Sequence, residues 1–119
     1  MRVNWGTKRR TWADAVYSKP AEDGKSEEAF SFRVFVEALT DGEIAQLLMG
    51  ERHEAEEIVV SHVLDWSGPK DESGDPVPFD PDELRDGINQ DPDVREAVLR
   101  ALMWASREGV RKNSRTSPG

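Results

Sequence analysis

The feature that most constrains the fold of this chain is the run Phe30–Glu37, in which apolar side chains recur at every second position. This period is typical of a β-strand with one buried face. The stretch 10–18 also alternates and is expected to be a strand. Residues 19–28 between the two are rich in Pro, Asp, Gly and Ser, which favour turns. The two stretches predict an antiparallel hairpin, whose apolar face must be covered by helices because an isolated hairpin is marginal in water.

Two helices are predicted after the hairpin. Thr40 and Glu43 can form a capping box, in which each side chain accepts a hydrogen bond from the other residue's backbone amide, and Gly50 is a suitable end for this helix. Residues 51–66 carry apolar side chains three and four positions apart, which predicts a second helix over the whole stretch. Residues 65–79 are rich in Gly, Pro and Asp and are expected to form a long loop or a short hairpin.

Two further helix starts share one pattern. Asp80 precedes Pro81, and Asp91 precedes Pro92. An aspartate can cap the first turn, and a proline at the first helical position loses no needed amide. The last helix carries a continuous apolar stripe, and Gly109 is expected to end it.

These elements predict an α+β fold, with an N-terminal antiparallel β-hairpin followed by about four α-helices, mainly helical. A chain of 119 residues has room for one small domain. Residues 1–9 show no period and are expected to be a flexible N-terminal arm. Residues 10–109 are expected to form the single α+β domain, and the polar residues 110–119 a disordered C-terminal tail.

The net charge of −8 is concentrated in the middle of the chain. Residues 51–93 contain 14 acidic and 3 basic side chains, so their balance is 3 − 14 = −11. Such a segment repels the phosphates of nucleic acids and suits either solubility or contact with a basic protein surface. No apolar run approaches the length of about 20 residues that spans a membrane. The first residues lack an apolar signal core, so the protein is expected in the cytoplasm.

Candidate catalytic and metal sites are weak. His53 begins a pattern that resembles the zinc-protease helix, but the position four residues along is Glu57, and the next histidine, His62, is too far away. The segment 71–75 has the composition of a calcium loop without the required ligand spacing. The absence of cysteine excludes thiol catalysis and thiolate zinc sites. We therefore expect no enzymatic activity, no metal and no cofactor.

Aromatic and large apolar residues are plentiful for so small a core. Phe35 lies on the strand face opposite the other apolar residues of its strand, so both faces of the strand are candidates for burial. Trp104 directly follows Leu102 and Met103, which makes the last helix apolar around more of its girth than one small core requires. Either these residues complete a tightly packed core or they form a protein-binding patch. The candidate partner-binding residues are Phe35, Trp66, Leu102, Met103 and Trp104.

The order of motifs along the chain is informative. The strand Phe30-Ser31-Phe32-Arg33-Val34 runs into Leu39-Thr40-Asp41-Gly42-Glu43. The middle of the chain reads Val63-Leu64-Asp65-Trp66-Ser67-Gly68, and Gly74-Asp75-Pro76-Val77-Pro78-Phe79 follows. The helix start Asp91-Pro92-Asp93-Val94 and the closing Arg107-Glu108-Gly109-Val110-Arg111-Lys112-Asn113 come last. Over residues 10–113 this order resembles the small tail assembly chaperones of long-tailed bacteriophages.

This resemblance implies a non-enzymatic role in virion morphogenesis. Such chaperones bind the long helical tape measure protein in the host cytoplasm, keep it soluble and recruit tail tube subunits. They leave before the tail is finished, so the protein is not expected in the mature virion. An apolar face can cover an apolar stripe of the partner, while an acidic exterior keeps the complex dispersed. Proteins that coat a filament often self-associate, so a second copy of the chain is a further candidate partner, whereas nucleic acid and membranes are not.

Two other functions are alternatives. The acidic middle segment also suits a small adaptor or inhibitor that binds a basic protein partner. A metal-dependent hydrolase would use His53, His62 and nearby acids. The presence of a stoichiometric metal would favour the hydrolase, and binding that high salt abolishes would favour the adaptor.

Overall fold

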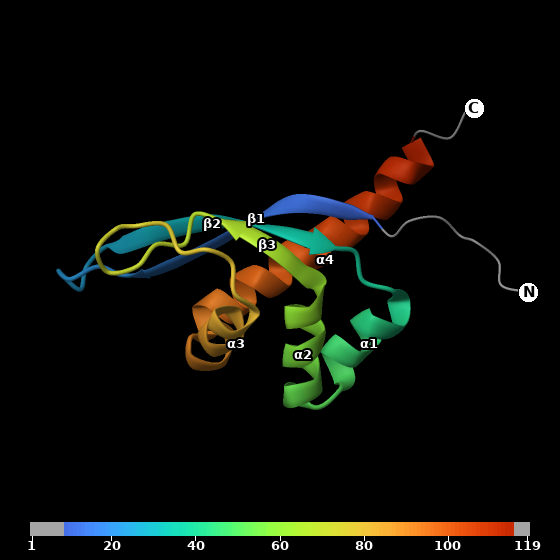
Figure 1. Cartoon of the computed structure of the whole chain (residues 1–119), viewed down its shortest axis with the longest axis horizontal. Helices are drawn as coiled ribbons and strands as arrows, with labels where there is room; N and C mark the ends of the chain where they lie inside the picture. The colour runs from blue at the N-terminus through green and yellow to red at the C-terminus, as the bar shows by residue number, and fades with distance from the viewer. Residues whose placement is uncertain (1–8, 116–119) are drawn as a thin grey trace, which may run out of the picture.

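The computed structural model describes residues 9–115, with the side chains of residues 9–107. The predicted α+β class is confirmed: an antiparallel hairpin and a third strand form one sheet, and four helices accompany it (Figure 1). The elements are β1 (Arg10–Pro20), β2 (Glu27–Glu37), α1 (Asp41–Met49), α2 (Arg52–His62), β3 (Val63–Ser67), α3 (Pro81–Gln90) and α4 (Pro92–Arg115). Within the described residues, no helix is both long enough and apolar enough to cross a membrane.

The sheet is antiparallel with the strand order β1-β2-β3, and the helices lie against one of its faces (Figure 1). The predicted hairpin is confirmed, with Ala13 opposite Val34 and Tyr17 opposite Phe30. Its turn is held by Asp23, whose Oδ1 accepts hydrogen bonds from the backbone amides of Lys25 (2.9 Å) and Ser26 (3.1 Å).

The core lies between the hairpin and α4, which packs mainly against β1. Both elements bury small side chains, so the helix can approach the strand closely. Val34 of β2 and Val98 of α4 are among the largest fully buried side chains of this layer. The buried alanines are Ala13 and Ala15 of β1 and Ala97, Ala101 and Ala105 of α4.

Side-chain hydrogen bonds connect α4 to the rest of the fold. The buried hydroxyl of Ser106 accepts a hydrogen bond from the backbone amide of Leu39 (2.9 Å) and donates one to the carbonyl of Leu102 (2.9 Å). Six residues earlier on the helix, the guanidinium of Arg100 donates to the carbonyl of Val16 in β1 (3.2 Å). α4 is therefore attached both to the segment that leaves β2 and to the sheet's outer strand.

The caps predicted for the helices are largely confirmed. Thr40 and Glu43 form the expected capping box at the start of α1, and Gly50 ends that helix. Asp80 caps α3, where its carboxylate accepts a hydrogen bond from the amide of Asp82 (2.9 Å), and Pro81 occupies the first helical position.

The helix predicted over 51–66 is wrong in its last part. α2 ends at His62, and the chain continues as strand β3, in which Val63 pairs with Val36 and Trp66 pairs with Val34. The spacing of residues 59, 63 and 66 fits a helical face, but the long-range pairing with β2 overrides this local pattern.

The helix predicted to end at Gly109 instead continues to Arg115. A glycine inside a helix costs about 1 kcal/mol relative to alanine, which a helix anchored by a long buried stripe can tolerate. Residues 110–115, expected to be a disordered tail, are therefore helical. Residues 116–119 of the expected tail and residues 1–8 of the expected arm lie outside the described residues.

His62 joins three elements in a buried network. Its Nδ1 lies 2.9 Å from the carbonyl oxygen of Glu37 at the end of β2, and its Nε2 lies 2.6 Å from Oε2 of Glu43 in α1. The carbonyl can only accept, so Nδ1 donates to it, and Nε2 is left to contact the carboxylate. The pKa of Glu43 is lowered: burial acts most strongly and raises it, but hydrogen bonds from Thr40 and His62 outweigh that effect.

Replacing Glu43 by Gln tests this network. Because the pKa of Glu43 is lowered in the folded protein, its ionised form stabilises the fold above the unfolded-state pKa, and this stabilisation is lost as the pH falls through the folded-state pKa. We expect the free energy of unfolding to fall more between about pH 6 and about pH 3 in the wild type than in Glu43→Gln. Urea unfolding at both pH values measures this, with Glu54→Gln on the exposed face of α2 as the control. Equal losses in the wild type and Glu43→Gln would contradict the assignment.

Candidate protein-binding site

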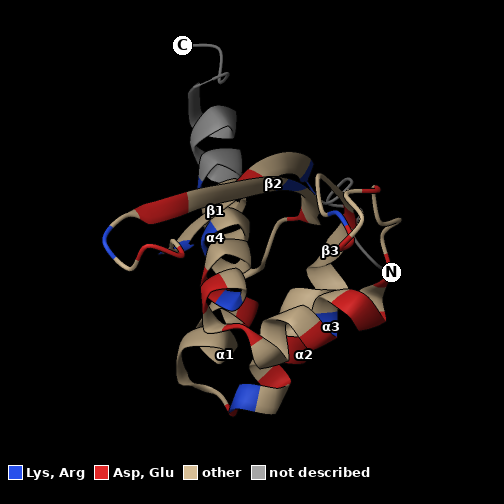
Figure 2. Ribbon diagram, turned by 90° about the vertical axis from the view of Figure 1, so that its left-hand side faces the viewer, with Lys and Arg blue, Asp and Glu red and all other residues tan. Residues whose placement is uncertain are grey.

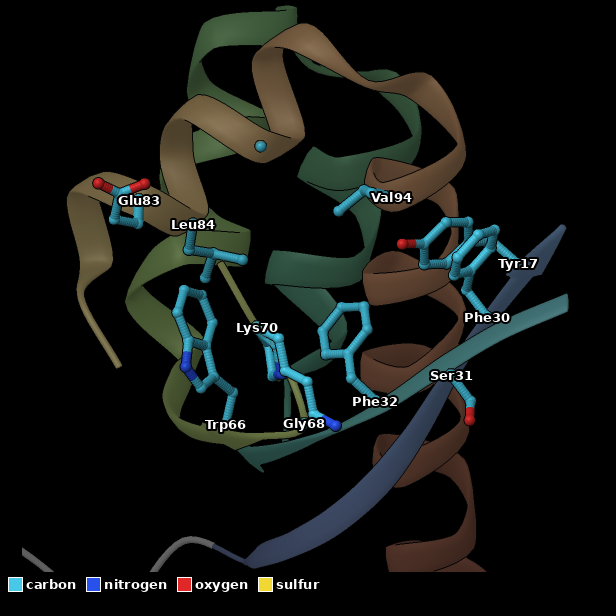
Figure 3. Close-up of a pocket in the computed structure, with 12 residues that line it drawn as sticks. Tyr17, Phe30, Ser31, Phe32, Trp66, Gly68, Lys70, Glu83, Leu84 and Val94 are labelled. Carbon is cyan, nitrogen blue, oxygen red and sulfur yellow. The ribbon is translucent and has the colours of Figure 1, made fainter. Parts of the chain in front are cut away.

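The helical layer does not cover the whole hairpin. The tip of the hairpin extends beyond α3 and the start of α4 (Figure 1). An apolar pocket of about 510 Å³ opens where the covering ends, between the hairpin, the loop after β3, α3 and the start of α4 (Figure 3). Its main apolar lining residues are Tyr17, Phe30, Phe32, Trp66, Leu84 and Val94.

One wall of this aromatic pocket is formed by the hairpin. The ring of Tyr17 stacks on Phe30 with 5.3 Å between centroids, and it meets Phe32 edge-on at 6.4 Å. Phe32 packs against the core, whereas Phe30 is 36% exposed. Strand pairing and ring contacts fix these side chains, so a ligand would meet a preformed surface that loses little entropy on binding.

The opposite wall is Trp66 of β3, whose ring points into the same space as Phe32 (Figure 3). Its Nε1 donates a hydrogen bond to the carbonyl of Val77 (2.7 Å), and Phe79 meets the ring edge-on at 5.1 Å. The loop that supplies both contacts is itself ordered by Asp71, whose Oδ1 accepts from the amides of Ser73 (2.9 Å) and Asp75 (3.0 Å). The acidic segment 71–75, whose composition suggested a calcium loop, thus orders part of the loop that contacts Trp66.

Charged groups lie around the mouth of the aromatic pocket. Lys70 and Glu83 are part of its lining. At the hairpin side, Lys19 bonds to Asp91 (2.8 Å) and Asp93 (3.4 Å) at the start of α4. The hydrogen bond from Lys19 lowers the pKa of Asp91. The pKa of Tyr17 is raised, mainly by burial and then by the negative charge of Asp91. The Lys19 contacts fix the end of the hairpin to α4 at the edge of the pocket.

The structure does not bring the predicted partner-binding residues together. Of these, Trp66 alone lines the aromatic pocket. Phe35 lies on the sheet face that points away from the helices, beside Trp12, with ring centroids 5.3 Å apart. Met103 is partly buried against the core, and Trp104 is about half exposed on α4.

Leu102 corrects the prediction for the last helix. Its side chain is 0% exposed and belongs to the hydrophobic core, so it cannot meet a partner while the protein is folded. At this position the apolar stripe of α4 packs into the core. An apolar stripe in a sequence does not show whether its residues pack into the core or contact a partner.

Other apolar surface residues were not predicted as sites. Tyr17 and Phe30 lie at equal distances from the hairpin turn, a signal that could have placed them opposite each other. Leu48 and Met49 at the end of α1 are 70% and 88% exposed. In the sequence, these two residues and Leu47 form three consecutive apolar positions immediately before Gly50, which ends the helix. This pattern could have indicated an exposed apolar surface at the end of α1.

The histidines considered as metal ligands lie apart from the aromatic pocket. Both ring nitrogens of His62 already contact protein oxygens, and His53 is exposed on α2. No group of three or more histidine or acidic side chains that could hold a metal ion occurs within the described residues.

Comparisons of the chain with models of protein families, with curated proteins and with solved structures found no match. The aromatic pocket is therefore interpreted from its own geometry. Its preformed apolar walls and charged mouth have the character of a ligand-binding pocket.

Gly68 allows the close approach of the two pocket walls. Its φ is +118°, and a Cβ added there would lie 3.0 Å from the Cβ of Phe32. Gly74 also has a positive φ, +85°, but an added Cβ would meet nothing within 4 Å. We expect Gly68→Ala to lower the free energy of unfolding by about 1–3 kcal/mol more than Gly74→Ala, because it also forces Phe32 to move. Urea unfolding of the two variants measures this difference, and equal losses would show that the contact with Phe32 is unimportant.

Proposed function

We propose that this protein is a bacteriophage tail assembly chaperone that binds and solubilises the tape measure protein in the host cytoplasm and recruits tail tube subunits, without catalysing a reaction. The order of sequence motifs described above supports this role. The observation that carries the proposal is the open aromatic pocket, with Phe30 partly exposed at its edge.

The pocket suits the chemistry of such a partner. A long helical protein that awaits enclosure in a tube exposes apolar stripes, and these lead to aggregation unless they are covered. An amphipathic helix binds a groove by inserting apolar side chains that recur every three or four residues. The rings of Phe32 and Trp66 are already in place to receive such a side chain.

The surroundings of the pocket are acidic, which suits a solubilising protein. Asp82, Glu83 and Asp86 of α3 are exposed, and Figure 2 shows further acidic residues along α2. A high net charge keeps a complex dispersed through mutual repulsion. The apolar contact and the acidic exterior therefore have separate roles in the proposed mechanism.

Co-expression with a tape measure protein, which the proposal expects a neighbouring reading frame to encode, tests the proposal. We expect Phe30→Asp to abolish co-purification and to reduce the soluble yield of the tape measure protein, because a carboxylate would be placed at the apolar pocket. Val16→Asp is the matched control, since Val16 is an exposed apolar residue on the opposite face of the same hairpin. Thermal unfolding by circular dichroism verifies that both variants fold. If both variants retained the tape measure protein, the assignment of the pocket would be wrong.

The acidic adaptor remains the second candidate, because residues 51–93 carry 14 acidic side chains against 3 basic ones. Salt separates the two functions. Binding through an apolar pocket persists at about 0.5 M salt, whereas binding of a basic surface by exposed carboxylates is largely screened there. Capture of a basic protein that high salt abolishes and Phe30→Asp leaves unchanged would favour the adaptor.

A further inference from the structure

The end of α1 exposes the most accessible large apolar side chains in the described part of the chain. Leu48 is 70% exposed and Met49 is 88% exposed. No residue of α1 is fully buried, although this helix has an apolar face that includes Ile44 and Leu47. Two adjacent residues of this kind form a projecting apolar knob, which is unfavourable in water unless another surface covers it.

A second pocket lies directly beside this knob. It has a volume of about 560 Å³ and shares no lining residue with the aromatic pocket. Leu47 and Gly50, which flank the knob in sequence, are both part of its wall. Its other apolar lining residues are Ala55, Val59, Ile88, Pro92 and Leu99. The knob and this α1–α4 pocket therefore lie side by side on one surface, yet the knob does not fill the pocket of its own molecule, since both its residues remain exposed.

The charges around the α1–α4 pocket are balanced, unlike those of the whole protein. Arg52 and Arg95 line it together with Glu56 and Glu96, and Arg52 pairs with Glu56 at 3.3 Å. Two copies with a net charge of −8 repel each other over most of their surfaces. At this pocket, by contrast, arginines of one copy can face glutamates of another, so the patch is complementary to itself.

We propose that a second copy of this chain occupies the α1–α4 pocket, with Leu48 and Met49 of each copy inserted into the pocket of the other about a two-fold axis. A knob and a pocket on the same surface make such a contact self-complementary, so one symmetric encounter buries both knobs. A symmetric dimer of this kind buries the knobs of both copies, so no exposed knob remains to bind a third copy. Because the pocket and the knob are separate from the aromatic pocket, this inference does not depend on the proposed function.

The oligomeric state of the full chain tests the proposal. We expect sedimentation velocity between about 1 µM and about 200 µM to show a monomer–dimer equilibrium, and Met49→Glu to raise the dimer dissociation constant at least about tenfold. Val16→Glu is the control, because it places the same charge on an exposed apolar residue that does not line the pocket. Circular dichroism verifies that both variants are folded. A monomer at every concentration, or a dimer that Met49→Glu does not weaken, would overturn the proposal.

Disulfide trapping tests the geometry of the contact. The chain contains no cysteine, so single substitutions report one position each. We expect a mixture of Met49→Cys and Glu96→Cys proteins to form a crosslinked heterodimer under mild oxidation, because the knob of one copy reaches the pocket rim of the other. A mixture of Val16→Cys and Glu96→Cys proteins should not crosslink beyond background. Equal crosslinking in the two mixtures would contradict the proposed arrangement.

Discussion

The packing of α4 against the hairpin is the interaction on which the rest of the structure depends. The hairpin would be marginal in water by itself, and α4 removes its apolar face from solvent along most of β1. Small residues on both elements, such as Ala15 and Ala101, permit this close approach. The remaining helices then pack around α4 and the sheet, and Ser106 fixes the exit of β2 to the same helix.

Both proposed binding surfaces lie where this packing stops. The aromatic pocket exists because the hairpin extends further than the helices that cover it, so Phe30 has no complete cover. The α1–α4 pocket lies at the other side of the helical layer, where α1 ends with Leu48 and Met49 in solvent. The two pockets have no residue in common, so the two proposed contacts do not compete for the same side chains.

Local signals predicted the hairpin and the helix starts because their causes are local. The alternation in Phe30–Glu37 and the caps at Thr40 and Asp80 depend on residues a few positions apart. Strand β3 was missed because its partner, β2, lies about thirty residues away, and the spacing of Val63 and Trp66 also fits a helix.

The candidate site was harder to predict than the fold. The sequence identifies Trp66 as a site residue, but the residues next to it in sequence do not show that it lies near Phe32. That placement depends on the tertiary structure around Gly68. Leu102 was assigned to a partner because a wide apolar stripe is compatible with both core and surface. Exposure depends on the relative lengths of packed elements, which a sequence pattern does not contain.

The contact between Arg100 and Val16 has a consequence for the sheet's outer edge. An edge strand offers unpaired backbone groups to any passing chain, and strand-by-strand growth from such an edge leads to fibres. The guanidinium occupies one of these acceptors and places a bulky cation beside the strand. This contact therefore makes β1 a poorer template for the strand-by-strand addition of other chains.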